Sequence, residues 1–253
     1  INDFNADDAK HKTWTLKEGV VKINGYNPQP GDVKFKDLRT DGVINAGDNT
    51  VDNPGDRKII GNDAARYQFG ISLGASYKGW SLEVLLQGVG KRDYWLGGPA
   101  MFPFGGAGAG DAVFQALYAN QTDYWRAKSY DPSSSDYMVP VNPDSKLFRI
   151  YDQGNNVGSN TRVSDKYLQN AAYMRIKNIT LAYTLPKEWV RRVFIQDAKF
   201  YLSIENLATF SSLPKGYDPE GTAPSSTANA LSNGISWGYP YYRTISLGAS
   251  ITF

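Results

Sequence analysis

One segment of the chain alternates between two kinds of side chain, and this pattern restricts the fold more than any other feature. From Tyr67 to Tyr77, the odd positions are aromatic or aliphatic, and the even positions are Gln, Gly or Ser. Successive side chains of a β-strand point to opposite faces, so the segment predicts a strand with one apolar and one polar face. Its length matches the roughly 9–11 residues that a tilted strand needs to cross a bilayer.

Four further segments show the same alternation and predict four more strands. Lys78-Gly79 predicts a tight turn into the second strand, which forms a hairpin over 67–90, although Leu85 and Val89 break its alternation. The third strand is expected from Tyr173 to about Leu185, the fourth from Lys199 to about Leu207, and the fifth from Tyr241 to Phe253. Arg175 and Lys177 are expected to lie beyond the apolar band of the third strand. Pro186 should end that strand, and a short amphipathic turn should follow it.

Short and long connections alternate along the chain. The links 78–79 and 186–198 are short, whereas 91–172 and 208–240 are long, and the polar segment 1–66 precedes the first strand. Long loops on one side and short turns on the other are typical of outer-membrane barrels. The fold class predicted is therefore all-β: about five antiparallel strands of a large transmembrane β-barrel. The long loops should be extracellular, and the C-terminus should face the periplasm.

Five strands cannot close such a barrel. Unpaired N–H and C=O groups of an open edge would cost roughly several kcal/mol each in lipid, so the remaining strands must come either from the same gene product upstream or from another chain. Because the chain begins at Ile1 rather than Met, we expect it to be a mature or cut piece.

Composition excludes several classes of function. The chain has no cysteine and a single histidine, His11, which leaves no disulfide, thiolate zinc site or cysteine nucleophile. A net charge of +2 argues against a nucleic-acid partner. No stretch is apolar for 18 residues, so no transmembrane helix is expected. Paired carboxylates such as Asp7-Asp8 occur, but nothing places two of them across a cleft, and we expect no enzyme activity.

Several ordered motifs resemble one family. The chain resembles the C-terminal third of SusC-like (RagA-like) TonB-dependent transporters, and the resemblance covers nearly all of it. The motifs are Pro30–Leu38, Asp41–Ile44, Ile60–Asn62, Tyr77–Trp80, Gln87–Gly90, Asp123–Trp125, Ser164–Leu168, Tyr173–Leu181, Glu205–Leu207 and Gly216–Glu220. After Trp125 the sequence departs from the usual pattern, and nothing is carried over for 126–140.

The resemblance implies a barrel of about 22 strands that a plug domain closes. It also implies a SusD-like surface lipoprotein as partner, and energy from TonB through an N-terminal region outside this chain. The substrate would be an oligosaccharide or a peptide, and the location the outer membrane, in contact with lipid. Two alternatives remain from the residues alone: a soluble carbohydrate-binding β-domain, whose apolar faces would meet across a sandwich, and a surface adhesin. Detergent dependence would distinguish a barrel from a sandwich.

The segment from Asp37 to Asp48 resembles a calcium loop, in which oxygen ligands at positions 1, 3, 5, 7, 9 and 12, with Gly at position 6, surround a hard cation. Calcium is therefore a possible cofactor. Arg39, at position 3, departs from this pattern because its cation would repel calcium. The other interpretation is a polar turn stiffened by side-chain hydrogen bonds to the backbone. The expected ligands are Asp37, Asp41, Val43 (through its carbonyl), Asn45 and Asp48.

Aromatic residues in the long loops are candidates for substrate contact, because aromatic faces bind sugar rings. Tyr94, Trp95 and Tyr130 are the candidates, whereas Trp125 is expected to pack loops together. The Gly-rich run 97–110 lacks the Lys-Ser/Thr of a phosphate cradle and predicts only a loop.

The C-terminus ends on an uninterrupted alternation. Apolar residues occupy every second position up to a terminal aromatic, the pattern that barrel-assembly machinery reads in outer-membrane proteins. An ordinary edge strand that ends in Phe is the alternative. The residues of the expected assembly signal are Leu247, Ala249, Ile251 and Phe253, with Ile245 before them.

Overall fold

The computed structural model describes residues 3–6, 14–96, 101–102, 119–151, 155–215, 217–221 and 241–253. The chain forms two compact units. One comprises residues 1–60, 95–167 and 225–235, and the other comprises residues 61–94, 168–224 and 236–253. In the described stretches, no helix is long and apolar enough to span a membrane.

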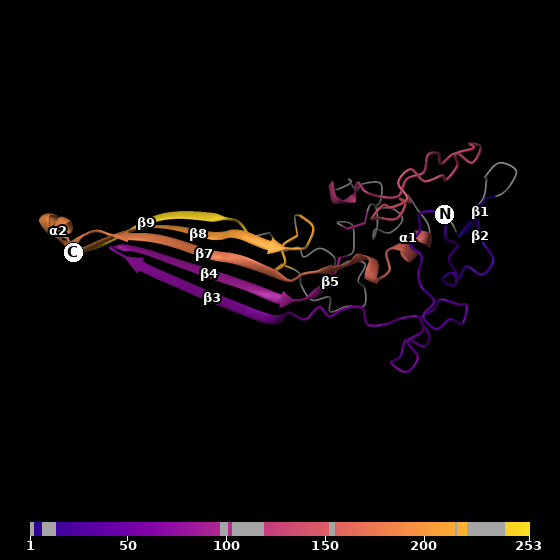
Figure 1. Ribbon diagram of the computed structural model, residues 1–253, viewed down its shortest axis with the longest axis horizontal. Helices are drawn as coiled ribbons and strands as arrows, with labels where there is room; N and C mark the ends of the chain where they lie inside the picture. Colours follow the sequence, from indigo (N-terminus) through magenta and orange to yellow (C-terminus); the bar gives the residue numbers. More distant parts are fainter. Residues whose placement is uncertain are drawn as a thin grey trace. The chain divides into compact units, whose positions relative to one another are not determined.

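The second unit is built on a five-stranded antiparallel sheet with the strand order β3-β4-β7-β8-β9 (Figure 1). The all-β antiparallel fold predicted from the alternation is confirmed. β8 continues beyond the expected end near residue 207, and β9 begins three residues later than expected. The strands are β3 (Arg66–Tyr77), β4 (Trp80–Lys91), β7 (Tyr173–Thr184), β8 (Asp197–Ser211) and β9 (Thr244–Thr252). Among the described residues, β3 and β9 each pair with a strand on one side only.

The hairpin between β3 and β4 is closed by the two residues expected. Lys78 and Gly79 both have positive φ, at 46° and 88°, as a type I′ turn requires. A Cβ on Gly79 would lie 2.8 Å from the carbonyl oxygen of Thr184. Glycine is therefore needed here both for its backbone conformation and for the close approach of β7.

The register slips once within the sheet. Leu85 and Leu86 of β4 pair with Asn178 and Ile176 of β7, so Lys177 is an extra residue opposite β4. The pairing of β7 with β8 is irregular at the same place. A single extra residue reverses which face the following side chains occupy. The face to which the odd-numbered residues point therefore differs between the two halves of β7.

The connection between β7 and β8 is helical rather than extended. Pro186 lacks the N–H needed to continue a ladder, and α2 (Lys187–Val190) and η4 (Arg191–Val193) follow it. Val190 is buried, whereas Trp189 is exposed, as an amphipathic turn requires. The Gln196 N–H donates to the Thr252 carbonyl at 2.8 Å and joins this connection to the end of β9.

The first unit is mostly irregular and has an aromatic core. Phe102, Leu147, Phe148 and Tyr167 form this core, and Trp95 packs against it. The shorter elements, here and where the chain passes between the units, are β1 (Phe4–Ala6), β2 (Trp14–Leu16), β5 (Asp93–Trp95), η2 (Ala119–Gln121), α1 (Asn155–Asn160), η3 (Asp165–Tyr167) and β6 (Leu168–Asn170). β1 pairs with β2, and β5 pairs with β6.

Side-chain hydrogen bonds hold distant loops of this unit together. The Asp32 carboxylate accepts from the Tyr151 hydroxyl at 2.6 Å and from the Asn160 amide at 2.8 Å. Trp125 is buried and lies on the backbone of Gly31, where a Cβ would come within 2.5 Å of the indole ring. The prediction that Trp125 packs loops together is confirmed.

Candidate functional site

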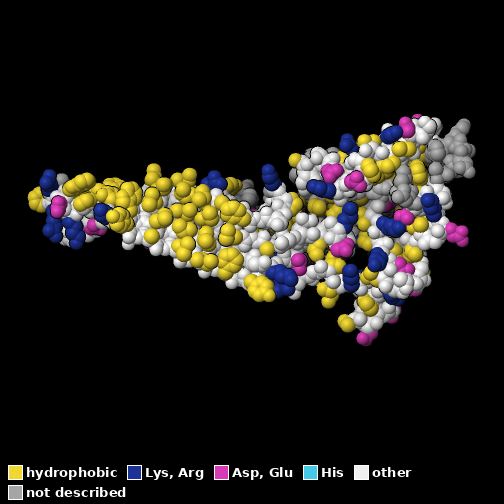
Figure 2. All heavy atoms as spheres, viewed as in Figure 1, with side chains coloured by type: hydrophobic (Ala, Val, Ile, Leu, Met, Phe, Trp, Pro, Cys, Tyr) yellow, Lys and Arg dark blue, Asp and Glu magenta, His cyan; other side chains and the backbone are white. Residues whose placement is uncertain are grey.

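One face of the five-stranded sheet is apolar from edge to edge. The register aligns its side chains in rows across all five strands. These side chains are exposed or partly exposed, most of all on the edge strands, where Leu73 is 56% and Leu247 is 83% exposed. Figure 2 shows hydrophobic side chains gathered over the strands. One row is Leu73, Val84, Ile179, Ile204 and Ile245, and the next is Ala75, Leu82, Leu181, Leu202 and Leu247.

A row of aromatic residues borders this apolar face at the end with the short turns. Tyr77, Trp80, Tyr183 and Phe200 are consecutive cross-strand partners. The Trp80 and Tyr183 rings lie 4.7 Å apart. Rings with an apolar body and a polar edge suit a membrane–water boundary, and outer-membrane barrels carry such girdles. The face therefore has the physical character of a surface that contacts a bilayer.

The opposite face of the sheet is polar. The Asn178 side-chain amide donates to the Ser203 hydroxyl at 3.0 Å, and the hydroxyl oxygens of Thr180 and Ser203 lie 3.1 Å apart. Leu85 is an exception, because it pairs with Ser72 and Asn178 on this face. Its position explains why β4 shows a broken alternation in the sequence.

The polar face also carries a cationic side chain, Arg175, and Lys177 contacts the same carboxylate as Arg175. From the sequence, Arg175 was expected at a position along the strand beyond the apolar band, and the register gives its face: Arg175 pairs with Gln87 and Thr209 on the polar face. The slip at Lys177 determines this face, because it reverses the parity of the first half of β7. Counting alternate residues back from Ile179 would assign Arg175 to the wrong face.

Arg175 and Lys177 form a cluster of ion pairs with the segment 217–221. Arg175 is 2% exposed, and its guanidinium lies 2.7 Å from Asp218 and 3.2 Å from Glu220. Lys177 Nζ lies 2.8 Å from the same Glu220 carboxylate. Arg175 Nε also donates to the Thr209 hydroxyl at 2.8 Å. Two cations thus meet two carboxylates, and the buried charges are balanced.

An aromatic ring and two backbone amides complete the cluster. The Tyr241 ring centre lies 5.0 Å from the Arg175 guanidinium and 4.5 Å from Lys177 Nζ, within reach of a cation–π interaction. Burial opposes ionisation of Asp218, but hydrogen bonds from the Glu220 amide, Arg175 and the Tyr241 amide outweigh it and lower the pKa of its carboxyl. Removing one partner of a buried ion pair typically costs roughly 3–5 kcal/mol, so the cluster holds this segment firmly against β7.

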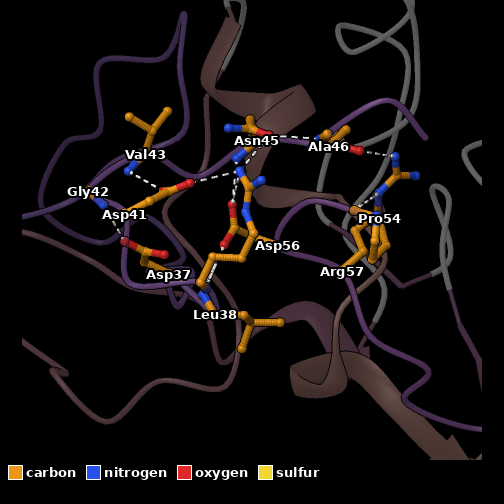
Figure 3. A network of polar contacts seen from close by, with 12 residues as sticks. Asp37, Leu38, Asp41, Gly42, Val43, Asn45, Ala46, Pro54, Asp56 and Arg57 are labelled. Carbon is orange, nitrogen blue, oxygen red and sulfur yellow. Dashed lines mark hydrogen bonds and ion pairs between the residues drawn. The ribbon is translucent and has the colours of Figure 1, made fainter. Parts of the chain in front are cut away.

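The loop from Asp37 to Arg57 is organised by carboxylates that accept backbone N–H groups (Figure 3). Asp37 accepts from the Thr40 and Gly42 amides, and Asp41 accepts from the Val43 amide. Asp56 accepts from Leu38, Arg39 and Asn45 amides at 2.9, 3.2 and 2.9 Å. Its side chain is 1% exposed. Burial opposes its ionisation, yet these hydrogen bonds and nearby Arg39 lower the pKa of Asp56.

The expected calcium ligands lie in this loop, and Arg39 contacts two of them. Its guanidinium lies 3.0 Å from Asp41 Oδ2 and 3.0 Å from Asn45 Oδ1. Asp48 instead accepts from the Asn53 side chain at 2.8 Å. Within the described ranges, no group of three or more His, Asp or Glu residues is arranged to hold a metal ion. Calcium binding by Asp37, Asp41, Val43, Asn45 and Asp48 stays a prediction.

The aromatic candidates for substrate contact have different environments. Tyr94 is 4% exposed and Tyr130 is 50% exposed. Trp95 is partly buried against the aromatic core, with its ring 6.0 Å from Phe102. Tyr130 therefore offers the most accessible ring of the three, and their substrate contact stays a prediction. His11, Asp7-Asp8 and most of the Gly-rich run 97–110 lie outside the described residues.

The predicted assembly signal lies on one face of β9. Leu247 pairs with Leu202, Ala249 with Phe200, and Ile251 with Ala198. Phe253 follows β9 and is 80% exposed. The arrangement keeps the alternation intact up to the last residue, and its role in assembly stays a prediction.

Comparison with known proteins agrees with this geometry. TonB-dependent receptor P3 of Formosa agariphila is 26% identical over 241 residues, which is 93% of this chain and 20% of that protein. The chain is similar to TonB-dependent receptors. A second such receptor of the same organism, P26, is 24% identical over 244 residues, or 95% of this chain and 22% of that protein. The chain thus spans about a fifth of the length of these TonB-dependent receptors.

The chain also has counterparts among solved structures. A chain of the RagAB peptide transporter is 22% identical to this chain, with a TM-score of 0.46. The match covers 74% of this chain and 17% of the transporter chain. The RagAB peptide importer in its closed-closed state is 23% identical, with a TM-score of 0.41 and the same coverage. No family model matches the sequence.

Proposed function

We propose that this chain forms part of the wall of an outer-membrane β-barrel, and that the complete protein is a TonB-dependent importer of oligosaccharides or peptides. One observation carries the proposal. A five-stranded meander exposes a continuous apolar face bordered by aromatic residues, and its other face is polar. A wall between lipid and a water-filled lumen needs both faces.

The sheet edges support the same function. β3 and β9 each lack a second neighbour among the described residues, and unpaired backbone groups are costly in hydrocarbon. Strands from the rest of a longer protein would satisfy these edges and close the barrel. The likeness to receptors about five times as long as this chain is consistent with such strands.

The alternative of a soluble sandwich is disfavoured by exposure. In a sandwich, the apolar face of one sheet is buried against a second sheet. Here Leu247, Ile245 and Leu73 remain 83%, 64% and 56% exposed. Water would not favour so large a contiguous apolar surface, because soluble monomers rarely expose patches above a few hundred Å².

The polar side and the loops would handle cargo and partners. The loops 1–66, 91–172 and 208–240 would lie outside the cell and contact substrate and a SusD-like lipoprotein. TonB would act through an N-terminal region of the complete protein, and the C-terminus would face the periplasm. The ion pairs of Arg175 and Lys177 would hold the segment 217–221 inside the lumen wall, and so fix where the last loop leaves the barrel.

The test uses cells that carry the complete gene or lack it. Wild-type cells should hold the protein in the outer-membrane fraction, and only detergent should extract it. Uptake of a labelled oligosaccharide mixture or a labelled peptide mixture should fall on deletion, and also on collapse of the proton-motive force. The mixture whose uptake falls identifies the class of substrate, oligosaccharide or peptide. Extraction by salt alone, or unchanged uptake in both arms, would contradict the proposal.

A further inference from the structure

The connection between β7 and β8 exposes an unusual set of side chains. Lys187, Arg191 and Arg192 are exposed, and in the part of the chain that the structure describes none of them forms a salt bridge. Trp189 is 61% exposed and Phe194 is 92% exposed. Cations beside exposed aromatic rings are the composition of a segment that lies at a membrane interface.

Phe194 occupies a backbone conformation that a bulky side chain rarely adopts. It ends η4 with φ of 62° and ψ of 25°, in the left-handed region. Such a conformation is unfavourable for a large residue and persists where it serves a purpose. Here its consequence is that an apolar ring projects into solvent, beside a hollow that Arg191 also lines.

A hollow of about 470 Å³ lies beside this ring. Lys187 and Arg191 line it together with Phe194, Ile195 and Gln196. The two cations are one helical turn apart in sequence, a spacing that places side chains on the same side of a helix. A phosphate group between an ammonium and a guanidinium gains charge-assisted hydrogen bonds, while Phe194 and Ile195 offer an apolar wall beside it.

The hollow is attached to the end of the sheet that carries the aromatic row. Gln196 N–H donates to the carbonyl of Thr252, and α2 lies beside the C-terminus in Figure 1. In a barrel wall, this end reaches the membrane surface, where lipid headgroups lie at the level of the aromatic girdle.

We propose that the 187–196 turn binds the phosphate headgroup of an anionic phospholipid, with Lys187, Arg191 and Arg192 as the cations and Phe194 as an apolar anchor. The inference rests on the proposed function, because it requires a bilayer beside the turn. Charge complementarity selects the anionic lipid: the turn carries three exposed cations against one exposed carboxylate, Glu188, which leaves it net positive, and each basic residue near a membrane surface contributes to attraction for anionic lipid. Phe194 adds contact with the acyl boundary.

The test compares two triple variants of the complete protein in nanodiscs. The turn variant is Lys187→Gln, Arg191→Gln and Arg192→Gln. The control is Lys17→Gln, Lys22→Gln and Lys58→Gln, which removes the same charge from exposed positions in the first unit. The measurement is how much phosphatidylglycerol each protein retains when the nanodisc lipid is exchanged for phosphatidylcholine. The affinity for phosphatidylglycerol should fall by about fivefold for each cation that the turn variant removes. The control should match the wild type.

A second variant tests the anchor. Asparagine tolerates the left-handed conformation better than phenylalanine, so Phe194→Asn should be at least as heat-stable as the wild type in detergent. In phosphatidylglycerol nanodiscs it should lose retained lipid. If Phe194 merely points into water, the variant keeps its lipid, and this result would overturn the proposed anchor.

Further outcomes separate the possible failures. Equal lipid retention by the two triple variants would overturn the lipid site. Displacement of the lipid by millimolar inorganic phosphate would show a simple anion site and would also overturn it. Fractionation of the same cells is the independent readout of the proposed function: a wild-type protein absent from the outer membrane refutes that function, whereas a protein present there without lipid preference refutes only this inference.

Discussion

Replacing Leu247 by arginine tests the lipid-facing surface at a single position. Leu247 is the fourth of the nine residues of β9, and it completes a row of apolar residues across the sheet. It is 83% exposed within the chain, so the substitution removes little packing against protein. The cost of Leu247→Arg therefore depends almost entirely on the solvent that this face meets.

The two solvents give very different magnitudes. In lipid, an arginine near the bilayer midplane costs roughly 2–4 kcal/mol, which lowers the ratio of folded to unfolded protein about 30- to 900-fold. In water, a substitution at so exposed a position changes stability by about 0.5 kcal/mol or less. The expected result is thus a large loss in a membrane and almost none in solution.

Ser246→Arg is the matched control. Ser246 precedes Leu247 and pairs with Ser203 on the polar face. The assay is the amount of complete, heat-modifiable protein in the outer-membrane fraction of cells expressing each variant. Leu247→Arg should be severely depleted, and Ser246→Arg should stay close to the wild type. Equal levels for the two variants would refute the assignment of the faces.

Three further predictions follow from the loops and the ion-pair cluster. Folding lowers the pKa of Asp218. The ionised carboxyl therefore contributes its full stabilisation above the unfolded pKa of 3.8, and this contribution is lost as the pH falls through the lower folded pKa. Hydrogen exchange of 217–221 should rise only at such acid pH, and Asp218→Asn should remove this pH dependence. Arg39→Asn should raise calcium affinity, measured by titration calorimetry on the complete protein, because it removes a cation from two expected ligand oxygens; unchanged affinity counts against the calcium loop. A cysteine at Ser134 should react with an impermeant thiol reagent on intact cells, whereas one at Lys187 should react only after the membrane is opened, and the reverse would overturn the topology.

The sheet could be predicted from the sequence because its signal is local. Alternation needs no knowledge of partners, and it located all five strands of the sheet. Register is not local, since the slip at Lys177 is defined only by what β4 and β8 place opposite it. The face that Arg175 occupies therefore could not be predicted from the sequence, although the motif that contains it had been identified.

The organisation of the 37–57 loop shows the same limit. Asp56 lies outside the 12-residue calcium pattern, yet its buried carboxylate receives three backbone amides of that loop. The position of Asp56 in the sequence does not indicate this role. Its hydrogen-bond partners lie 11 to 18 residues away and are set by tertiary structure. The left-handed Phe194 was equally beyond pattern analysis, because sequence alone favours Gly or Asn at such positions.

The most direct test of the account is an accessibility scan along β9. The chain contains no cysteine, so single cysteines at residues 244–251 can carry a spin label in the complete, reconstituted protein. Oxygen, which concentrates in lipid, should relax the spin labels at positions 245, 247, 249 and 251. A water-soluble nickel complex should instead relax the spin labels at positions 244, 246, 248 and 250. A period of two in both measurements, in opposite phase, is the predicted result. Water accessibility at Leu247 and Ile245 equal to that at Ser246 would contradict a membrane-spanning wall.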